Sequence, residues 1–367
     1  MQFELRTQVI EPQRKTFQHL IDRYGDRPAS RYEEGTIDLQ AKVNYHFRPL
    51  WDPSKEIYSP DFSALKLTDP YAWTDPRQFY YAPYVTARAE LHEAFGATLS
   101  YLEQRGMFQR LPASWASLFE DIVLPLRHYE SAAQMLLSYA ARYGWGTTIT
   151  QCFAYSSFDR IGNAQILSRA GISFGGGSAE PLELAKRTWL EDDAFQPLRE
   201  HVEKMLVERD WGKALIALDI TDQMLFTVFF THLDDAALNA GAASYSLVAQ
   251  HFSQWFTDQR KWLDSLLKAW VNDPEAGAAN AAVIGDVATA TLPIARAALA
   301  AVCAKADQLV DAGTVAALDA AADGIRSNLG ALGALGVSVA DRADRADTAD
   351  TADTADRADT ASEGSTA

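Results

Sequence analysis

The chain has 367 residues, of which 48% are hydrophobic, so it can bury one large core or two ordinary ones. Its 33 basic and 49 acidic side chains give a formal net charge of −16. An acidic chain repels phosphate, and no segment gathers enough Lys and Arg to make an exception, which excludes nucleic-acid and anionic-membrane partners from our expectations. The two cysteines are too few and too far apart for a disulfide framework, so we expect a cytoplasmic protein.

The sequence predicts neither a signal peptide nor a membrane span. The N-terminal residues MQFELRTQVIEPQRK carry charges throughout and contain no apolar core. The most apolar run, ALIALDITDQMLFTVFF, contains Asp219 and Asp222 and is shorter than the roughly 20 residues that a span needs.

Residues 1–70 predict an extended N-terminal arm, because they are rich in Pro, Arg and aromatic residues and poor in helical periodicity. Within the arm, VNYHFRPLWDP alternates apolar residues such as Tyr45 and Phe47 with polar ones, which is the period of a strand. Pro49 and Pro53 exclude a regular central strand there.

Helical signals begin at Asp75, which supplies an N-cap acceptor before a proline. A long helix should follow, kinked near its start by Pro83 and ended at Gly106. The further expected helical segments are Ser114 to Gly144 with an interruption at Pro125, Thr147 to Arg169 with a stop at Gly171, Pro181 to Arg209, Asp210 to Leu238, Ala242 to Val271, Ala276 to Ala306 and Thr314 to Leu332.

Long helices with short connections imply antiparallel neighbours, so residues 71–337 predict an all-α helix bundle with no strand outside the arm. Residues 338–367 repeat an Ala-Asp-Thr/Arg triplet that offers no apolar stripe to a helix. We interpret them as a disordered acidic tail, and an acidic interaction tail is the alternative.

A ferritin-like di-iron site is the first chemistry to test in such a bundle. It needs two Glu-x-x-His pairs, because side chains at i and i+3 share one helix face and can bind the same metal. The residues three positions before the seven histidines are Thr16, Val43, Ala89, Pro125, Leu198, Phe229 and Val248. None of them is acidic, so the sequence predicts no di-iron ligands on this chain.

Asp219 and Asp222 share a helix face and could hold a metal, but no histidine stands at a matching spacing. We favour the alternative in which Arg side chains from neighbouring helices satisfy both acids. The glycines around Trp145 lack the dinucleotide-binding spacing, and Cys152 has no identifiable His and acid partners. The sequence therefore predicts no catalytic, metal or cofactor-binding residue on this chain.

Aromatic and Arg residues gather in the arm and in the first long helix, and these residue types favour protein interfaces. The predicted subunit-interface residues are Tyr45, Phe47, Arg48, Trp51, Arg77, Phe79, Tyr80 and Tyr84. The alternative is that they cover the core of their own bundle. For Arg48 and Arg77 we favour charge-assisted bonds to a partner over ties between the arm and the first helix.

Four segments carry a family resemblance: RYGDRPASRYEEG, AKVNYHFRPLWDP, TDPRQFYYAPYVTARAELHEA and FDRIGNAQILSRAGI. They resemble the oxygenase β subunit of bacterial multicomponent phenol hydroxylases. The likeness runs from near the N-terminus to about Leu267, is loose in the Ala-rich region that follows, and does not include the tail.

The resemblance implies a ferritin-like subunit without the metal site, paired with a di-iron α subunit and a γ subunit in an α2β2γ2 hydroxylase. It further implies a coupling protein and an NADH reductase with FAD and [2Fe-2S], which together convert phenol to catechol. A β subunit of a related toluene or alkene monooxygenase is the alternative within the family. A free-standing helical protein that binds a ligand or metal is the alternative outside it.

These expectations predict the outcome of two deletions. Removal of residues 1–66 should leave a folded bundle that no longer binds the α subunit. Removal of residues 338–367 should change neither folding nor assembly.

Overall fold

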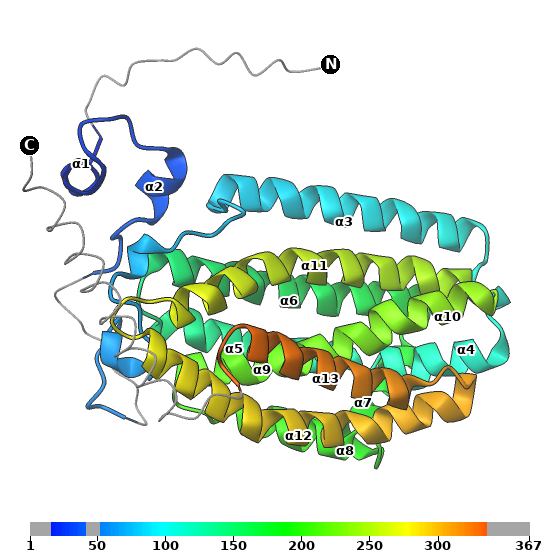
Figure 1. The fold of residues 1–367 in the computed structure, drawn as a ribbon. Coiled ribbons are helices and arrows are strands. Elements are labelled where there is room, and N and C mark those ends of the chain that lie inside the picture. The colour runs from blue at the N-terminus through cyan, green and yellow to red at the C-terminus, as the bar shows by residue number, and fades with distance from the viewer. Residues whose placement is uncertain (1–15, 42–51, 336–367) are drawn as a thin grey trace, which may run out of the picture.

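A computed structural model describes residues 16–41 and 52–335. In this part of the chain every regular element is a helix, so the predicted all-α bundle is confirmed (Figure 1). The α-helices are α1 (Gln18–Tyr24), α2 (Arg31–Thr36), α3 (Tyr81–Gln104), α4 (Ala113–Leu118), α5 (Leu126–Tyr143), α6 (Thr147–Phe174), α7 (Glu180–Glu191), α8 (Gln196–Leu206), α9 (Trp211–Phe226), α10 (Leu233–Asn239), α11 (Ala243–Val271), α12 (Gly277–Val310) and α13 (Thr314–Ala331). The short elements are η1 (Pro60–Phe62), η2 (Pro70–Ala72) and η3 (Phe108–Arg110), which are 3-10 turns, and η4 (Phe119–Val123) and η5 (Thr227–His232), which are π-helical.

The long helices lie side by side, with α1 and α2 outside one end of the bundle (Figure 1). Helix α5 packs along α6, and α12 packs against α8, α9 and α13. Aromatic rings fill the centre: the Trp255 ring centroid lies 5.2 Å from that of Phe226, and Phe252 stacks on Phe230 at 4.5 Å. Burial of such large rings removes much apolar area from water and helps to hold the helices together.

Most helix boundaries follow the sequence signals. One exception is the expected segment Pro181 to Arg209, which is two helices, α7 and α8, separated by residues 192–195. Helix α3 begins at Tyr81 instead of near Asp75, because the Asp75 side chain accepts from the Arg77 backbone N–H at 2.9 Å and closes a local turn. Pro83 therefore lies in the first turn of α3, where its missing N–H removes no helical hydrogen bond, and the expected kink inside the helix was wrong.

Helix α6 also differs from expectation, since it continues past Gly171 to Phe174. A Cβ atom at Gly171 would stand only 2.6 Å from Cδ2 of Leu182 and 3.1 Å from Cδ2 of Leu124. This glycine is thus a point of close packing inside a helix, and the true stop is at Gly175.

The described part of the arm is folded onto the bundle, which corrects our expectation of an extended segment without secondary structure. Phe62 and Leu65 are buried in the main core. The carboxylate of Asp210, which caps α9, accepts from Ser63 Oγ at 2.6 Å and from the Ala64 N–H at 2.7 Å. Deletion of residues 1–66 would therefore remove core residues and two bonds to the Asp210 carboxylate, so we now expect this deletion to destabilise the bundle itself.

Two helical stretches are long and apolar enough, by length and composition, to cross a membrane: Trp211–Asn239 and Gly277–Val310. The most apolar window of the first is 78% buried inside the bundle and contains the buried acids Asp219 and Asp222. This burial is typical of a core helix in a globular domain. The corresponding window of the second is 44% buried.

Candidate functional site

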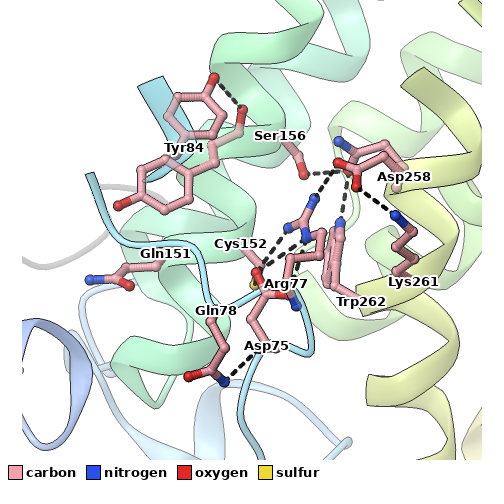
Figure 2. Close-up of polar contacts among 12 residues, drawn as sticks. Asp75, Arg77, Gln78, Tyr84, Gln151, Cys152, Ser156, Asp258, Lys261 and Trp262 are labelled. Carbon is pink, nitrogen blue, oxygen red and sulfur yellow. Dashed lines mark hydrogen bonds and ion pairs between the residues drawn. The ribbon is translucent and has the colours of Figure 1, made fainter. Parts of the chain in front are cut away.

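The loop before α3 is tied to α11 through Arg77, as Figure 2 shows. The Arg77 Nη2 atom lies 3.1 Å from Asp75 Oδ2, and Nη1 lies 3.3 Å from Asp258 Oδ2. Burial acts to raise the pKa of Asp258, but the guanidinium groups of Arg77 and Arg88 outweigh it and hold that pKa below its ordinary value. The loop is thus fixed by charge to the chain's own helices.

The Cys152 thiol lies beneath this loop and is fully enclosed (Figure 2). Its Sγ atom is 3.4 Å from Asp75 Oδ2. Burial, and then the neighbouring Asp75 carboxylate, raise the pKa of the thiol well above its usual value. A nucleophilic cysteine needs the opposite environment, so Cys152 is a core residue.

Helix α3 is held to α6 and α11 by a second network. Arg88 Nε and Nη2 bond to Asp159 of α6 at 2.8 and 2.9 Å, and Nη2 also reaches Asp258 of α11 at 2.8 Å. The Tyr84 hydroxyl lies 2.8 Å from Asp159 Oδ1 and 3.2 Å from the Tyr155 carbonyl oxygen. One arginine thus joins three helices through two carboxylates.

A third network lies deeper, around Arg160 of α6. Its Nη1 bonds to Glu130 of α5 at 3.1 Å and its Nη2 to Asp222 of α9. Asn163 donates to the second oxygen of Glu130 at 3.2 Å, and the Tyr129 hydroxyl donates to Asp222 at 2.6 Å. Burial raises the pKa of Glu130 to about 7 despite the nearby guanidinium. Glu130, Asp222 and Arg160 are thus buried together in one network.

Asp219 of α9 pairs with Arg260 of α11, which also contacts Asp264. Burial raises the pKa of Asp219 to about 6, and Arg260 opposes that change. The interpretation that Arg side chains of neighbouring helices satisfy Asp219 and Asp222 is therefore confirmed. Asp219 pairs with Arg260, and Asp222 pairs with Arg160.

The described residues do not fit a di-iron centre. The buried carboxylates of Glu130, Asp219 and Asp222 already accept from arginine, and guanidinium groups stand beside the oxygens that a metal would need. Within residues 16–41 and 52–335, no three His, Cys, Asp or Glu side chains come together in a way that could hold a metal ion.

The predicted interface residues have different outcomes. Tyr45, Phe47, Arg48 and Trp51 lie outside the described residues. Arg77 and Tyr84 are used inside the chain, so for Arg77 the structure supports the alternative of a tie between the arm and its own helices. Phe79 and Tyr80 are half-buried, and the Arg77 guanidinium lies 4.6 Å from the centre of the Phe79 ring.

The sequence analysis missed the buried charges that organise the bundle, namely Arg88, Glu130, Asp159, Arg160 and Asp258. Their spacing offered no common signal. The residues at i±3 and i±4 are mostly apolar or aromatic around Arg88, but around Asp159 and Arg160 they include the polar Ser156 and Asn163. The partner of each charge comes from another helix, so spacing along one helix did not reveal the pairs.

An apolar surface accompanies the second network. On α3, the Tyr81 side chain is 72% exposed and Val85 is 41% exposed. On α6, Phe158 is 55% exposed, and its ring centroid lies 6.4 Å from that of Tyr84. Large exposed apolar side chains that lie near one another mark candidate interaction sites.

Comparison with known proteins places these features in a family. The family model described as methane/phenol/alkene hydroxylase matches residues 51–274. The oxygenase component DmpL of phenol 2-monooxygenase from Pseudomonas sp. strain CF600 is 36% identical over 277 residues, which cover 75% of this chain and 84% of that protein. The β subunit of the hydroxylase component of the toluene-4-monooxygenase system from Ectopseudomonas mendocina is 24% identical over 58% of this chain and 66% of that protein.

A chain of the xenon-pressurised phenol hydroxylase from Pseudomonas sp. OX1 superimposes with a TM-score of 0.79 at 30% identity, covering 90% of this chain and 97% of that one. A chain of toluene 4-monooxygenase, with a TM-score of 0.66 at 20% identity, shares the fold. The family match extends over more than half of the chain and contains all the ion-pair networks described above. The chain therefore belongs to the methane/phenol/alkene hydroxylase family.

Proposed function

We propose that this chain is the noncatalytic β subunit of the hydroxylase component of a multicomponent phenol monooxygenase. It would pair with a di-iron α subunit and a γ subunit in a cytoplasmic α2β2γ2 assembly that hydroxylates phenol to catechol. A coupling protein and an NADH reductase with FAD and [2Fe-2S] would complete the system. The role of this chain is then to hold the metal-bearing subunit in its working conformation.

The observation that carries the proposal is the use of the core carboxylates. Glu130, Asp219 and Asp222 stand in the centre of a bundle whose relatives are oxygenase components, yet all three accept from Arg160 or Arg260. A subunit that bound iron through these carboxylates would need their oxygens free. The name of the toluene-4-monooxygenase relative, a β subunit, supports the same role.

The proposed contact surface has two parts. The first is the arm, with Tyr45, Phe47, Arg48 and Trp51, which lie outside the described residues. The second is the start of α3, where Phe79 and Tyr80 are half-buried and lead into the exposed Tyr81. Aromatic side chains of this kind act as anchors at subunit interfaces.

The test is co-expression of the tagged full chain with the candidate α and γ subunits from neighbouring reading frames. We expect all three to co-purify in equal amounts, with iron in the complex and none retained by this chain alone after anaerobic Fe(II) loading and gel filtration. NADH-dependent formation of catechol should require the complex. Iron retained by the isolated chain, or failure of the subunits to associate, would contradict the proposal.

A matched pair of variants locates the surface. Tyr81→Ala and Tyr101→Ala both remove an exposed tyrosine from α3, at opposite ends of the helix. We expect Tyr81→Ala to weaken binding of the α subunit by about 2 kcal/mol and Tyr101→Ala to have little effect. Trp51→Ala should also weaken binding, by about 2 kcal/mol or more. If the two tyrosine variants changed the affinity for the α subunit equally, the start of α3 would not be the contact surface.

The second candidate is a β subunit of a toluene or alkene monooxygenase, which the similarity to the toluene-4-monooxygenase β subunit supports. The reassembled complex, supplied in turn with phenol, toluene and a short alkene, distinguishes the two. Preferred turnover of toluene or the alkene would favour this candidate while leaving the scaffold role intact.

A further inference from the structure

The centre of the bundle contains a small cavity between the Arg160 and Arg260 networks, lined by both polar and apolar side chains. Ten side chains line it, and all ten are buried: Leu137, Ser156, Arg160, Leu215, Leu218, Asp219, Asp222, Gln259, Trp262 and Leu263. The space open to a water-sized sphere is about 10 Å³. That is close to the least volume that holds one water molecule, and it is too small for an organic ligand.

A second observation concerns Arg160 itself, whose side chain is 3% exposed. Its two terminal nitrogens bond to Glu130 and Asp222. Its Nε–H, however, is buried without a hydrogen-bond partner among the described residues. A buried donor on a charged group is strongly unfavourable when it is left unpaired, so an acceptor is expected beside it.

We propose that a single ordered water molecule occupies this cavity and accepts a hydrogen bond from Arg160 Nε. Its two O–H groups would donate to the oxygens of Asp219, Asp222 or Ser156. Each carboxylate has about four lone-pair positions. Two of these are used in Asp219, by Arg260 and Gln223, and two in Asp222, by Arg160 and Tyr129, so both acids keep room for a further donor.

The Arg160 Nε–H group favours water over other small occupants of the cavity. A metal cation cannot accept from an N–H group, and the adjacent guanidinium of Arg160 repels it. A small anion would accept from Nε but would face the carboxylates of Asp219 and Asp222 at close range. Water alone can accept from the arginine and donate to both acids. It would link the Arg160 network to the Arg260 network, between which no hydrogen bond runs among the described residues.

A high-resolution crystal structure of the full chain tests the site directly. We expect one spherical density peak about 2.7 to 3.2 Å from Arg160 Nε and from at least one carboxylate oxygen. A cavity without density, in an otherwise ordered core, would overturn the proposal. A peak with several oxygen contacts near about 2.4 Å would also overturn it, because that distance indicates a cation.

A solution measurement with a matched control complements the crystal. Ser156 and Ser157 are neighbouring buried residues of α6, but only Ser156 lines the cavity, while Ser157 bonds to Gln134 and Ser138. Ser156→Val should fill the space and reduce the number of long-residence waters, counted by oxygen-17 magnetic relaxation dispersion, by one per chain. Ser157→Val should leave that number unchanged. The same count in the wild type and both variants would contradict the proposal, provided that circular dichroism shows all three to be folded.

Discussion

Residues 81–271 and residues 277–331 are both built of long helices, but different chemistry holds them together. The first region buries several arginines with their carboxylates, as in the contact of Arg88 with Asp159. In the second, the buried side chains of α12 and α13 are small or aliphatic, apart from Asn280, Thr291, Thr314 and Cys303, and none is charged. The family model ends at residue 274, at the boundary between the two.

The two kinds of core constrain the arrangement of the helices to different degrees. A buried charge is stable only beside its partner, so α3, α5, α6, α9 and α11 can satisfy their arginines in one arrangement. An interface of alanines and leucines is stabilised by area and close packing, which many sequences can supply. We infer that the buried ion pairs of the first region restrict which sequences can adopt the fold of the family. The second region packs against the first and restricts its sequence less.

The largest expected effect comes from Arg160→Met. It leaves Glu130 and Asp222 buried without their common cation, so the free energy of unfolding should fall by about 3 to 5 kcal/mol. Urea denaturation followed by circular dichroism measures the loss. Arg326→Met is the control in the second region, since its pair with Asp323 is exposed and should contribute less than about 1 kcal/mol. Equal losses would remove the distinction between the two regions.

Arg88→Met should have the next largest effect, about 2 to 3 kcal/mol, because Asp159 keeps its bonds from Tyr84, Trp255 and Gln259. The effect should also be local. Hydrogen exchange is expected to become faster in α3, while amides in α12 keep their protection. Uniformly faster exchange would mean that α3 and the rest of the bundle open as one unit.

Packing should dominate in the second region. Ala295 of α12 is fully buried, so Ala295→Leu should destabilise the protein by about 1 to 3 kcal/mol through overpacking. Ala297→Leu, on the exposed side of the same helix, is the matched control and should change the melting temperature little. If Ala295→Leu left the melting temperature unchanged, the interface around Ala295 would not be closely packed.

The pH dependence of stability tests Glu130. Its pKa in the folded chain is about 7, above the ordinary glutamate value, so the folded state holds a proton that the unfolded state releases. Its contribution is present below the unfolded pKa and is lost as the pH rises through about 7. Between about pH 5 and pH 8, the free energy of unfolding of Glu130→Gln should therefore rise by about 1 to 3 kcal/mol relative to the wild type.

The control for that measurement is Glu93→Gln, which changes an exposed glutamate on α3. Its stability curve should run parallel to that of the wild type. A parallel curve for Glu130→Gln as well would mean that Arg160 keeps Glu130 ionised across the whole range.

The smallest expected effect is that of deleting residues 338–367, which should leave the melting temperature and subunit assembly unchanged because the segment offers no apolar stripe. A longer deletion from residue 329 removes buried Leu329 and should lower the melting temperature. Loss of assembly or turnover in the shorter deletion, with unchanged folding, would assign the acidic tail a role in partner binding.

The helical class and most helix boundaries could be predicted from the sequence, because caps, prolines and apolar periodicity act over a few residues. Helix α5 ends at Gly144, α11 runs from Ala243 to Val271, and α13 begins at Thr314, as the local signals predict. The missing Glu-x-x-His spacing was equally local. Where a signal had two readings, as at Gly171 or Pro83, the sequence could not choose between them.

Only the tertiary structure decided which charges meet. Arg160 finds Glu130 and Asp222 across 30 and 62 residues of chain, and Arg77 reaches Asp258 across 181. No periodicity records such pairs, because each depends on which helices are neighbours and how they are rotated. The same holds for Arg160 Nε, which is buried without a partner among the described residues, because a missing partner depends on every group that surrounds the donor.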